Sequence, residues 1–504
     1  MGTAWKNLWA SYLIFQSNFN AKYGAWVNRT IVLILAAIIL YAFVRAIAAG
    51  LRSRKSHSPL RTRTADPKLT RRASENLAGA IRIPTVTGDS ARMKELNRFL
   101  KEKYPKTMEN MDCAMLPGGS MLLRWRSELP TETLPVMFCG HLDVAPAGEG
   151  WTACEPFEGL QQNGRIYGRG AMDGKGVVIA LLEAAEDLIG QGVQPRRDVY
   201  FAFGCDEETE GKRGAQVIAK TMEEQGLRFD MILDEGGTFR DRKLSGGRVY
   251  SAAYIGMGEK RRCEYRVTAN CAGGSTFEPK KDTAIGALAE AICRVESAQP
   301  HHHLLPIVRN HLNTAIATFP FAKRFIIANK PLLNLLAGRV FRNDHEVGAL
   351  VRSTVVPSVL DGSFPAANML PATAGVTFSA RLLPHESPEK ILRHLQNLLA
   401  DLPVEVELVK EGETSFITSR KMPMYKLLKT TIEENYPQLP CVPTLMAACA
   451  DARHYSNLSD CILRFAPLTL GDEGGDHTHG ADEFLSEQSL GLAVDFYESL
   501  MKKL

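Results

Sequence analysis

The stretch from Leu134 to Pro146 constrains the fold of this chain more than any other. Its first half, up to Cys139, is an apolar run that is too short for a helix and predicts a buried strand. His141 and Asp143 follow at the carboxyl end of this strand, where open α/β sheets place their ligand sites. Because residues two apart in a strand point to the same side, both side chains can face one crevice. The pair is typical of a zinc ligand with an orienting carboxylate, although a strand-end histidine beside a chance acid is the plainer alternative.

The composition is that of an ordinary globular protein. The chain has 504 residues, of which 45% are hydrophobic and 23% charged, enough for two or more domains. The formal net charge is +4, and much of the basic excess is N-terminal, so nothing indicates nucleic-acid binding. Ten cysteines without a CxxC pair favour free thiols in a reducing compartment over disulfides.

The N-terminal region contains one segment that can cross a membrane. Residues Ile31–Gly50 are nearly all apolar, interrupted by Arg45, and have about the length that spans a bilayer core. No small-residue cleavage site stands out, so we expect residues 1–66 to form an uncleaved anchor and a linker. Basic residues gather after the segment, at Arg52, Arg54, Lys55, Arg61, Arg63, Lys68, Arg71 and Arg72. The positive-inside rule then predicts a single-pass membrane protein with its soluble body in the cytoplasm.

The rest of the chain predicts two domains. Alternating strand and helix patterns over residues 67–258 predict an α/β domain with a mostly parallel sheet, to which residues 411–504 return. Residues 259–410 follow a split βαβ pattern of the ferredoxin-like α+β kind, interrupted by an insertion at roughly His301–Phe364. The insertion contains the apolar run Phe325–Leu336, in which Pro331 argues against a second membrane span. A helix that faces a partner or a substrate is the expectation there.

Four further stretches supply acids or a histidine near the ends of predicted elements. Asp173 lies in a glycine-dense turn, residues 206–208 and 234–235 follow apolar strands, and His479 lies near the C-terminus. Any one of these stretches alone is more simply a solvated loop. Together with His141 they provide what a two-metal site requires. Imidazole and carboxylate ligands without cysteine favour zinc, and less firmly cobalt or manganese.

These motifs resemble those of the zinc exopeptidase and aminoacylase family, in the branch of carboxypeptidase S and the N-fatty-acyl-amino-acid hydrolases. The resemblance runs from about Leu69 to the C-terminus and keeps the order His141-Leu-Asp143, Met172-Asp173-Gly-Lys, Asp206-Glu207-Glu208, Leu233-Asp234-Glu-Gly-Gly and His479-Gly. It implies the zinc-exopeptidase fold, with two Zn²⁺ ions in the catalytic domain and a lid that also serves dimerisation. It assigns His141 and Asp234 to one zinc, Glu208 and His479 to the other, Asp173 as the bridge, Asp143 as the residue that orients His141, and Glu207 as the general base.

The resemblance also names three substrate contacts. Arg453 corresponds to an arginine that binds the substrate carboxylate, and Asn368 to a lid asparagine that contacts the substrate. Ser275 stands where the family has a histidine that helps to hold the carbonyl oxyanion, often from the partner subunit. The serine could donate a weaker hydrogen bond, or one of the histidines at 301–303 could replace it, and these alternatives stay open.

The leading hypothesis is a dizinc amidohydrolase that cuts an amide bond next to a free carboxylate. Its substrate would be a small peptide or an N-acyl amino acid, its other partners the membrane and a second copy of the chain. One alternative is a metal-retaining binding protein with weak or no catalysis, which the replacement at Ser275 suggests. Another is an amidase that acts in the condensing direction.

Overall fold

The computed structural model describes Trp26, Arg29–Leu51 and residues 63–504 except 130–132, 244–248, 280, 343, 363–366, 414–415, 438 and 471–477. The chain divides into two compact units. The smaller unit combines residues 1–55 with residues 315–336, and the larger unit holds the remainder.

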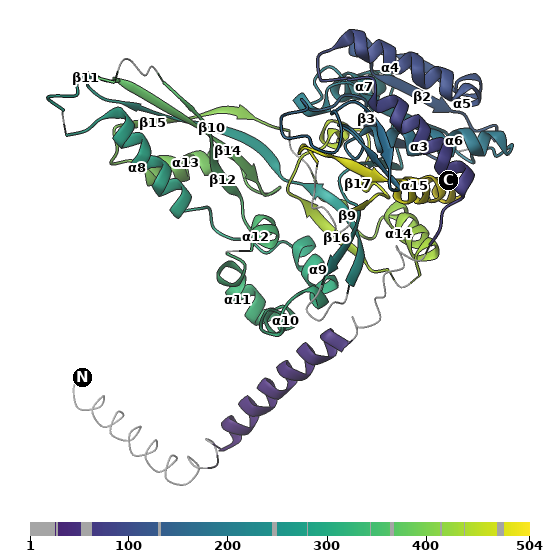
Figure 1. Cartoon of the computed structure of the whole chain (residues 1–504). Helices are drawn as coiled ribbons and strands as arrows, with labels where there is room; N and C mark the ends of the chain where they lie inside the picture. The colour runs from purple at the N-terminus through teal and green to yellow at the C-terminus, as the bar shows by residue number, and fades with distance from the viewer. Residues whose placement is uncertain are drawn as a thin grey trace, which may run out of the picture. The chain divides into compact units, whose positions relative to one another are not determined.

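The larger unit is built on a mixed sheet that, in the described residues, has ten strands (Figure 1). Nine of them follow the order β1-β2-β6-β3-β7-β17-β9-β8-β18, and β16 pairs with β9. The strands are β1 Asp112–Met115, β2 Met121–Trp125, β3 Val136–His141, β6 Val199–Gly204, β7 Met231–Asp234, β8 Phe239–Lys243, β9 Val249–Glu259, β16 Cys441–Met446, β17 Ile462–Arg464 and β18 Thr469–Leu470.

The α/β class is confirmed, and the sheet is mixed, with parallel pairs at its centre and antiparallel pairs on either side of them. The central strands β6, β3, β7 and β17 are parallel neighbours. Strand β2 pairs antiparallel with both β1 and β6, and β9 pairs antiparallel with both β8 and β17. A short connection, such as the one between β1 and β2, can join antiparallel strands as a hairpin, whereas parallel strands need a long crossover connection.

Helices cover both faces of the sheet because its central strands are apolar on both sides. In β3, the ring of Phe138 lies 6.0 Å from that of Tyr497 in α15 (Glu487–Met501). Its neighbours Met137 and Cys139 point the other way, into a cluster with α7 (Ala215–Glu224). Strands buried on both faces read as continuous apolar runs, which is how this strand could be recognised in the sequence.

The helices α3 (Pro67–Ile81) and α6 (Lys175–Gly190) pack with α15 on one side of the sheet. Asp66 caps α3 by accepting hydrogen bonds from the backbone N–H groups of Lys68 and Leu69 at 2.7 and 3.2 Å. Pro67 occupies the first helical position, where its missing N–H costs nothing.

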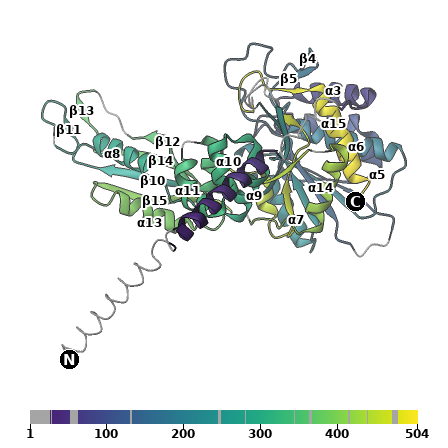
Figure 2. The ribbon, with the colours of Figure 1, turned by 90° about the horizontal axis from the view of Figure 1, so that it is seen from below.

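A second, four-stranded antiparallel sheet has the order β12-β14-β10-β15. Its strands are β10 Arg261–Asn270, β12 Thr354–Asp361, β14 Thr373–Leu382 and β15 Val404–Glu411, and its helices are α8 Ala284–Ser297 and α13 Pro388–Leu398. Alternate residues of β10, such as Tyr265 and Val267, are buried against the two helices. Strands β11 (Gly274–Ser275) and β13 (Met369–Leu370) form a separate small pair at the tip of this sheet (Figure 2).

The larger unit contains further described helices and strands. They are α4 Ser90–Lys103, α5 Pro105–Asn110, η2 Pro117–Gly119, β4 Leu160–Gln162, β5 Arg165–Tyr167, η3 Glu207–Thr209, α9 Pro306–Thr314, α12 His345–Val351, α14 Pro423–Asn435, η5 Asp451–Tyr455 and β19 Phe484–Ser486.

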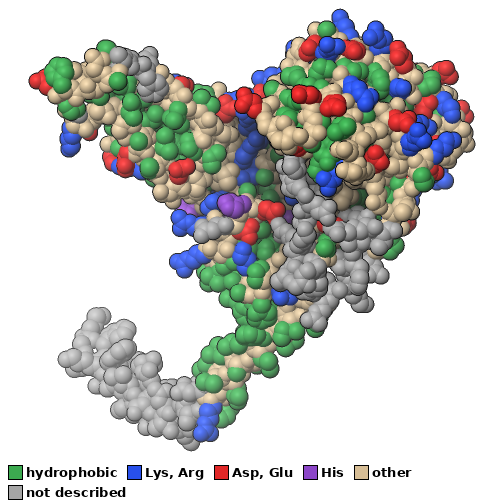
Figure 3. Space-filling model, viewed as in Figure 1, with side chains coloured by type: hydrophobic (Ala, Val, Ile, Leu, Met, Phe, Trp, Pro, Cys, Tyr) green, Lys and Arg blue, Asp and Glu red, His purple; other side chains and the backbone are tan. Residues whose placement is uncertain are grey.

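The smaller unit contains the helix Arg29–Leu51, η4 (Ile316–Thr318), α10 (Phe321–Ala328) and the start of α11 (Lys330–Val340). The side chains of helix Arg29–Leu51 are largely apolar and exposed (Figure 3). The helix is long and apolar enough to cross a membrane, a property that signal sequences share. The basic residues at 52, 54, 55 and 61 lie outside the described residues, so the orientation stays a prediction.

We predict that a buried carboxylate holds α6 against the N-terminal part of the larger unit. Glu183 in α6 is fully buried and accepts hydrogen bonds from Asn76, Tyr104 and Arg72 at 2.6, 3.0 and 2.5 Å. Glu183→Ala removes the acceptor of the Tyr104 phenol and the closer acceptor of the Asn76 amide, so the free energy of unfolding should fall by about 2–3 kcal/mol. The midpoint of thermal unfolding measures the effect. Glu75→Ala, on the exposed surface of α3, is the control. Equal decreases of the midpoint in the two variants would contradict the prediction.

Candidate active site

The candidate site forms where three neighbouring parallel strands end. His141 is the last residue of β3, Glu207 and Glu208 follow β6, and Asp234 and Glu235 stand at the end of β7. Because β3 lies between β6 and β7 in parallel register, the carboxyl ends of all three strands meet at one edge.

The imidazole of His141 meets two carboxylates. Its Nε2 atom lies 3.0 Å from Oδ1 of Asp173 and 3.2 Å from Oε1 of Glu235. Its Nδ1 atom lies 2.9 Å from the backbone oxygen of Asp143, which favours a proton on Nδ1 and leaves Nε2 as the ligand atom. Burial lowers the pKa of His141, but the carboxylates of Glu235, Asp143 and Asp173 outweigh burial and raise this pKa well above its usual value.

A second imidazole faces the other side of the same aspartate. Nε2 of His479 lies 3.2 Å from Oδ2 of Asp173 and 3.1 Å from Oε2 of Glu208. Asp173 therefore turns one oxygen to each histidine, the arrangement expected of a carboxylate that bridges two metal ions. The side chains form two possible ligand groups, His141 with Asp173 and Glu235, and His479 with Asp173 and Glu208.

The structure brings Glu235, rather than the expected Asp234, to His141. The carboxylate of Asp234 accepts hydrogen bonds from the backbone N–H groups of Glu235 and Ala452 at 2.9 and 2.7 Å. It is buried at the end of β7, and its neighbour carries the carboxylate that reaches the imidazole. The sequence offered both acids side by side, and only the direction of each side chain separates them.

Asp143 contacts both His141 and the loop that carries Glu207 and Glu208. It is fully buried, and Oδ1 lies 3.4 Å from Nδ1 of His141. Its carboxylate accepts hydrogen bonds from the hydroxyl of Thr87 at 2.6 Å and from the backbone N–H groups of Glu207 and Glu208 at 3.1 and 3.3 Å. Burial raises the pKa of Asp143, but the contact with His141 and these hydrogen bonds lower it below its usual value.

Glu483 fixes the loop that carries Asp173, a role that sequence reasoning missed. Its buried carboxylate accepts hydrogen bonds from the backbone N–H groups of Gly170, Met172 and Asp173 at 3.1, 2.9 and 3.2 Å. Arg169 donates to the same carboxylate at 2.6 Å. No spacing rule links an acid near the C-terminus to a loop more than 300 residues earlier.

Glycine is required beside Asp173. A Cβ atom at position 174 would collide with the imidazole of His141, so the close approach of the loop to the histidine depends on Gly174. The next residue, Lys175, is buried and donates to the backbone oxygens of Ala80 and Ile83 at 2.9 and 2.7 Å, which fixes the start of α6.

The charge of the site fits a bound cation. Burial raises the pKa of Glu207 well above its usual value and, with help from neighbouring acids, raises those of Glu235 and Asp451 to about 7. Hydrogen bonds to Asp173 and Glu208 raise the pKa of His479 to about 10. So many buried carboxylates are costly unless positive charge compensates them, and imidazole with carboxylate is a donor set that suits zinc.

A cavity of about 320 Å³ opens beside these groups. Asp173, Glu207, Glu235 and His479 line it, so Glu207 faces the same space as the candidate ligands without belonging to either ligand group. Arg240 and Arg464 also line it, two cations that sequence reasoning missed. Arg464 is buried and paired with Glu259 at 3.0 Å, whereas the guanidinium of Arg240 lies 5.6 Å from the ring centre of Tyr254.

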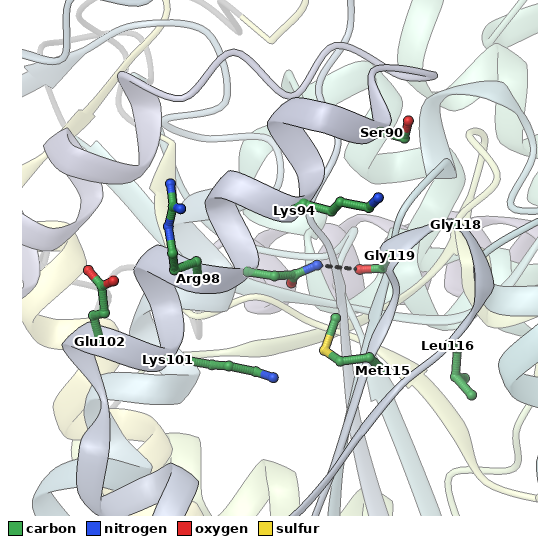
Figure 4. Close-up of a pocket in the computed structure, with 10 residues that line it drawn as sticks. Ser90, Lys94, Arg98, Lys101, Glu102, Met115, Leu116, Gly118 and Gly119 are labelled. Carbon is green, nitrogen blue, oxygen red and sulfur yellow. Dashed lines mark hydrogen bonds between the residues drawn. The ribbon is translucent and has the colours of Figure 1, made fainter.

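A larger hollow of about 610 Å³ lies between α4 and the turn at Gly118 and Gly119 (Figure 4). Lys94, Arg98 and Lys101 of α4 line one side of it. The predicted site residues that the structure describes do not line this hollow, so the candidate chemistry belongs to the smaller cavity.

The three predicted substrate contacts lie outside the cavity lining. Arg453 in η5 donates to the backbone oxygen of Ala450 at 2.7 Å, and Ala450 itself lines the cavity. Ser275 and Asn368 lie together at the tip of the second sheet, where Thr276 N–H donates to the backbone oxygen of Asn368 at 3.2 Å. The structure therefore groups the serine with the asparagine, but away from the candidate metal ligands of the same chain.

Comparison with known proteins identifies the family of this chain. The model of peptidase family M20/M25/M40 matches residues 137–503. The chain is 29% identical to the N-fatty-acyl-amino acid synthase/hydrolase PM20D1 of Xenopus tropicalis, over 94% of this chain and 93% of the relative. It is 32% identical to the probable carboxypeptidase S-like 2 of Dictyostelium discoideum, over 81% of this chain and 79% of the relative.

Among solved structures, the fold is similar to that of human carnosine dipeptidase 1, with a TM-score of 0.63 and 17% identity. The match covers 86% of this chain and 97% of that chain. The family match covers most of the residues that carry the site, from β3 to α15. The chain therefore belongs to peptidase family M20/M25/M40 and is a hydrolytic enzyme of the metallopeptidase and amidohydrolase type.

Proposed function

We propose that this enzyme is a dizinc amidohydrolase that cuts an amide bond next to a free carboxylate. One observation carries the proposal, namely that the two oxygens of Asp173 face two different histidines, each with a further carboxylate beside it. The relatives named for carboxypeptidase S and for N-fatty-acyl-amino acid hydrolysis support a small peptide or an N-acyl amino acid as the substrate.

The proposed ligand set follows the two groups in the structure. His141 and Glu235 would hold one ion, Glu208 and His479 the other, with Asp173 shared between them. Metallopeptidases of the family depend on metal ions, typically zinc. When bound, two such ions polarise an amide carbonyl and make a water molecule acidic near neutral pH.

Glu207 would act as the general base and then as the general acid. It lines the cavity, and Asp143 fixes its backbone through the N–H group. Its carboxylate would take a proton from water as the water oxygen bonds to the carbonyl carbon. When the C–N bond breaks, the same carboxyl group would return the proton to the leaving nitrogen.

The remaining assignments concern substrate and assembly. Arg453, or Arg240 inside the cavity, would bind the substrate carboxylate through a planar guanidinium. The βαββαβ order of the second sheet supports a ferredoxin-like lid, formed by residues 259–410, that would also serve dimerisation. Its tip, with Ser275 and Asn368, would then contribute to the cavity of a partner subunit.

The helix Arg29–Leu51 would anchor the enzyme as a single-pass membrane protein. Residues 67–258 and 411–504, which share the ten-stranded sheet, would form the catalytic domain on the cytoplasmic side. The length and apolar character of the helix support the anchor, and the basic residues after it support the orientation.

Replacing each of the two acids at the end of β7 by its amide tests the ligand set. Because Glu235 faces His141 and Asp234 faces backbone N–H groups, Glu235→Gln should lose about one of two bound zinc ions per chain. Asp234→Asn should keep both ions and lower the midpoint of thermal unfolding instead. Elemental analysis after dialysis measures the zinc, and zinc loss confined to Asp234→Asn would restore Asp234 as the ligand.

Removing the proposed base tests the mechanism. Glu207→Gln keeps the shape of the side chain but cannot take a proton, so hydrolysis of dipeptides and N-acyl amino acids should fall about a thousandfold with zinc retained. Glu210→Gln, in the same loop but paired with Lys410, is the matched control. Near-normal turnover by Glu207→Gln would refute the assignment, and no hydrolysis of any substrate by the wild type would refute the proposed activity.

Restoring the family histidine tests the lid. If the tip reaches the reacting carbonyl, Ser275→His should raise the rate of amide hydrolysis roughly tenfold or more, because an imidazole is the stronger oxyanion donor. Phe277→His places the same group two residues away, on a side chain that is 82% exposed, and should change nothing. Equal rates for both variants and the wild type would place Ser275 outside the reaction.

A further inference from the structure

The smaller unit joins two segments that are far apart in the sequence. Phe43 of helix Arg29–Leu51 has its ring centre 6.0 Å from that of Phe321 and 5.0 Å from that of Phe325, both in α10. The side-chain amide of Asn329, at the end of α10, donates to the backbone oxygen of Ala42 at 3.3 Å. These contacts fasten the insertion to one side of the apolar helix.

The contacts lie at a defined height on that helix. Phe43 precedes Leu51 by eight residues, which is about 12 Å along the helix axis. Arg45 is the first charged residue after Phe43, about 3 Å further along. If the helix spans a bilayer, the edge of the hydrocarbon lies between Arg45 and Leu51, because a long cationic side chain can reach back to the interface. The contacts with α10 then lie about 3–12 Å inside the hydrocarbon.

The charged and polar groups of the insertion fit this depth. A Cβ atom at Gly50 would collide with the guanidinium of Arg324, so this cation of α10 lies at the carboxyl end of the helix, where the membrane surface would be. At the deeper contact, the amide of Asn329 also donates to the backbone oxygen of Phe325 at 2.6 Å and is largely buried. A polar group that is satisfied within helix contacts is tolerated in lipid.

The outward side chains of the insertion are apolar at several positions. Leu335 of α11 is 73% exposed and Phe321 of α10 is 43% exposed. They lie in the run Phe321–Leu336, which combines large apolar side chains with lysine and arginine. Interfacial helices of this kind bury their apolar face about 5–10 Å into a leaflet. Lys330 is exposed at the start of α11 and could meet the phosphate groups of anionic lipids.

We propose that α10 and the first half of α11 insert into the same membrane leaflet as the carboxyl half of helix Arg29–Leu51. The insertion is thus a second, monotopic contact with the acyl chains of the lipid bilayer, built around Phe43 and Asn329. The inference rests on the proposed anchor. We assign lipid as the partner of this surface, because the exposed apolar side chains of the insertion adjoin those of helix Arg29–Leu51. That helix is itself long enough to span a membrane.

Photolabelling of the full chain tests this contact. The enzyme is reconstituted into vesicles of phosphatidylcholine and phosphatidylserine that contain a phospholipid with a diazirine in its acyl chain, and the adducts are mapped by peptide mass spectrometry. We expect adducts within Arg29–Leu51 and also within Phe321–Leu336. Phe277, in the turn after β11, and Leu360, in β12, are 82% and 66% exposed; they serve as internal controls and should stay unlabelled.

A matched pair of variants sharpens the test. Leu335→Glu places a charge against hydrocarbon and should lower the adducts within Phe321–Leu336 roughly tenfold. Leu360→Glu replaces a leucine of β12 that is 66% exposed and should leave the adducts within Phe321–Leu336 unchanged.

Adducts in the helix alone would overturn the inference, as would equal labelling of Phe277 and Leu360. A second copy of the chain covering this face would also exclude lipid from Phe321–Leu336 and give that negative result. Absence of adducts from the helix as well would overturn the anchor. Amide hydrolysis measured in the same vesicles reports separately on the proposed enzyme activity.

Discussion

The parallel pairing of β3 with β6 and β7 is the constraint on which the site depends. Val136 of β3 lies opposite Val199 of β6 and Met231 of β7, so the three strands run side by side to the same edge. Their apolar side chains are buried on both faces, which fixes the register. The acids that follow β6 and β7 are therefore placed at the same edge as His141 by the pairing of the strands that carry them.

Such convergence concentrates negative charge in a buried place, and the surrounding network makes this tolerable. Asp143 accepts three hydrogen bonds, and Glu483 accepts three backbone N–H groups in addition to its ion pair with Arg169. Both acids are buried, where an unpaired charge would cost several kcal/mol. They keep the loops of Glu207 and Asp173 in place, so the cavity presents carboxylates that are held before any ion or substrate binds.

Part of this site could be predicted from the sequence because it follows from strand ends. The strand ends predict His141 and the acids that follow the next two strands, whereas the ligand roles of Asp173, Glu208 and His479 come from the family resemblance. The structure places these residues in two groups that share Asp173. The choice between Asp234 and Glu235 depends on the direction of single side chains at the end of β7, which no periodicity resolves.

The fold divides in the same way between what local pattern encodes and what it does not. The strands and helices of the α/β class follow from apolar periodicity. The antiparallel flanks of the sheet depend on which strands pair, and the position of β17 beside β7 brings together Ile462 and Ile232, 230 residues apart in sequence. The role of Glu483 was equally hidden, because its partners are backbone N–H groups of a distant loop.

The chain carries its additional parts as nested insertions whose ends lie close together. The second sheet begins and ends at paired strands, since Cys263 of β10 lies opposite Glu411 of β15. The ends of the segment that contains α10 also lie close together. His302 forms a β-bridge with Arg352, and the His303 N–H donates to the backbone oxygen of Val351 at 2.6 Å. Insertions with adjacent ends leave the pairing of the parent sheet unchanged. An apolar insertion and a charged candidate metal site can therefore coexist in one chain, because neither has to alter the strands that position the other.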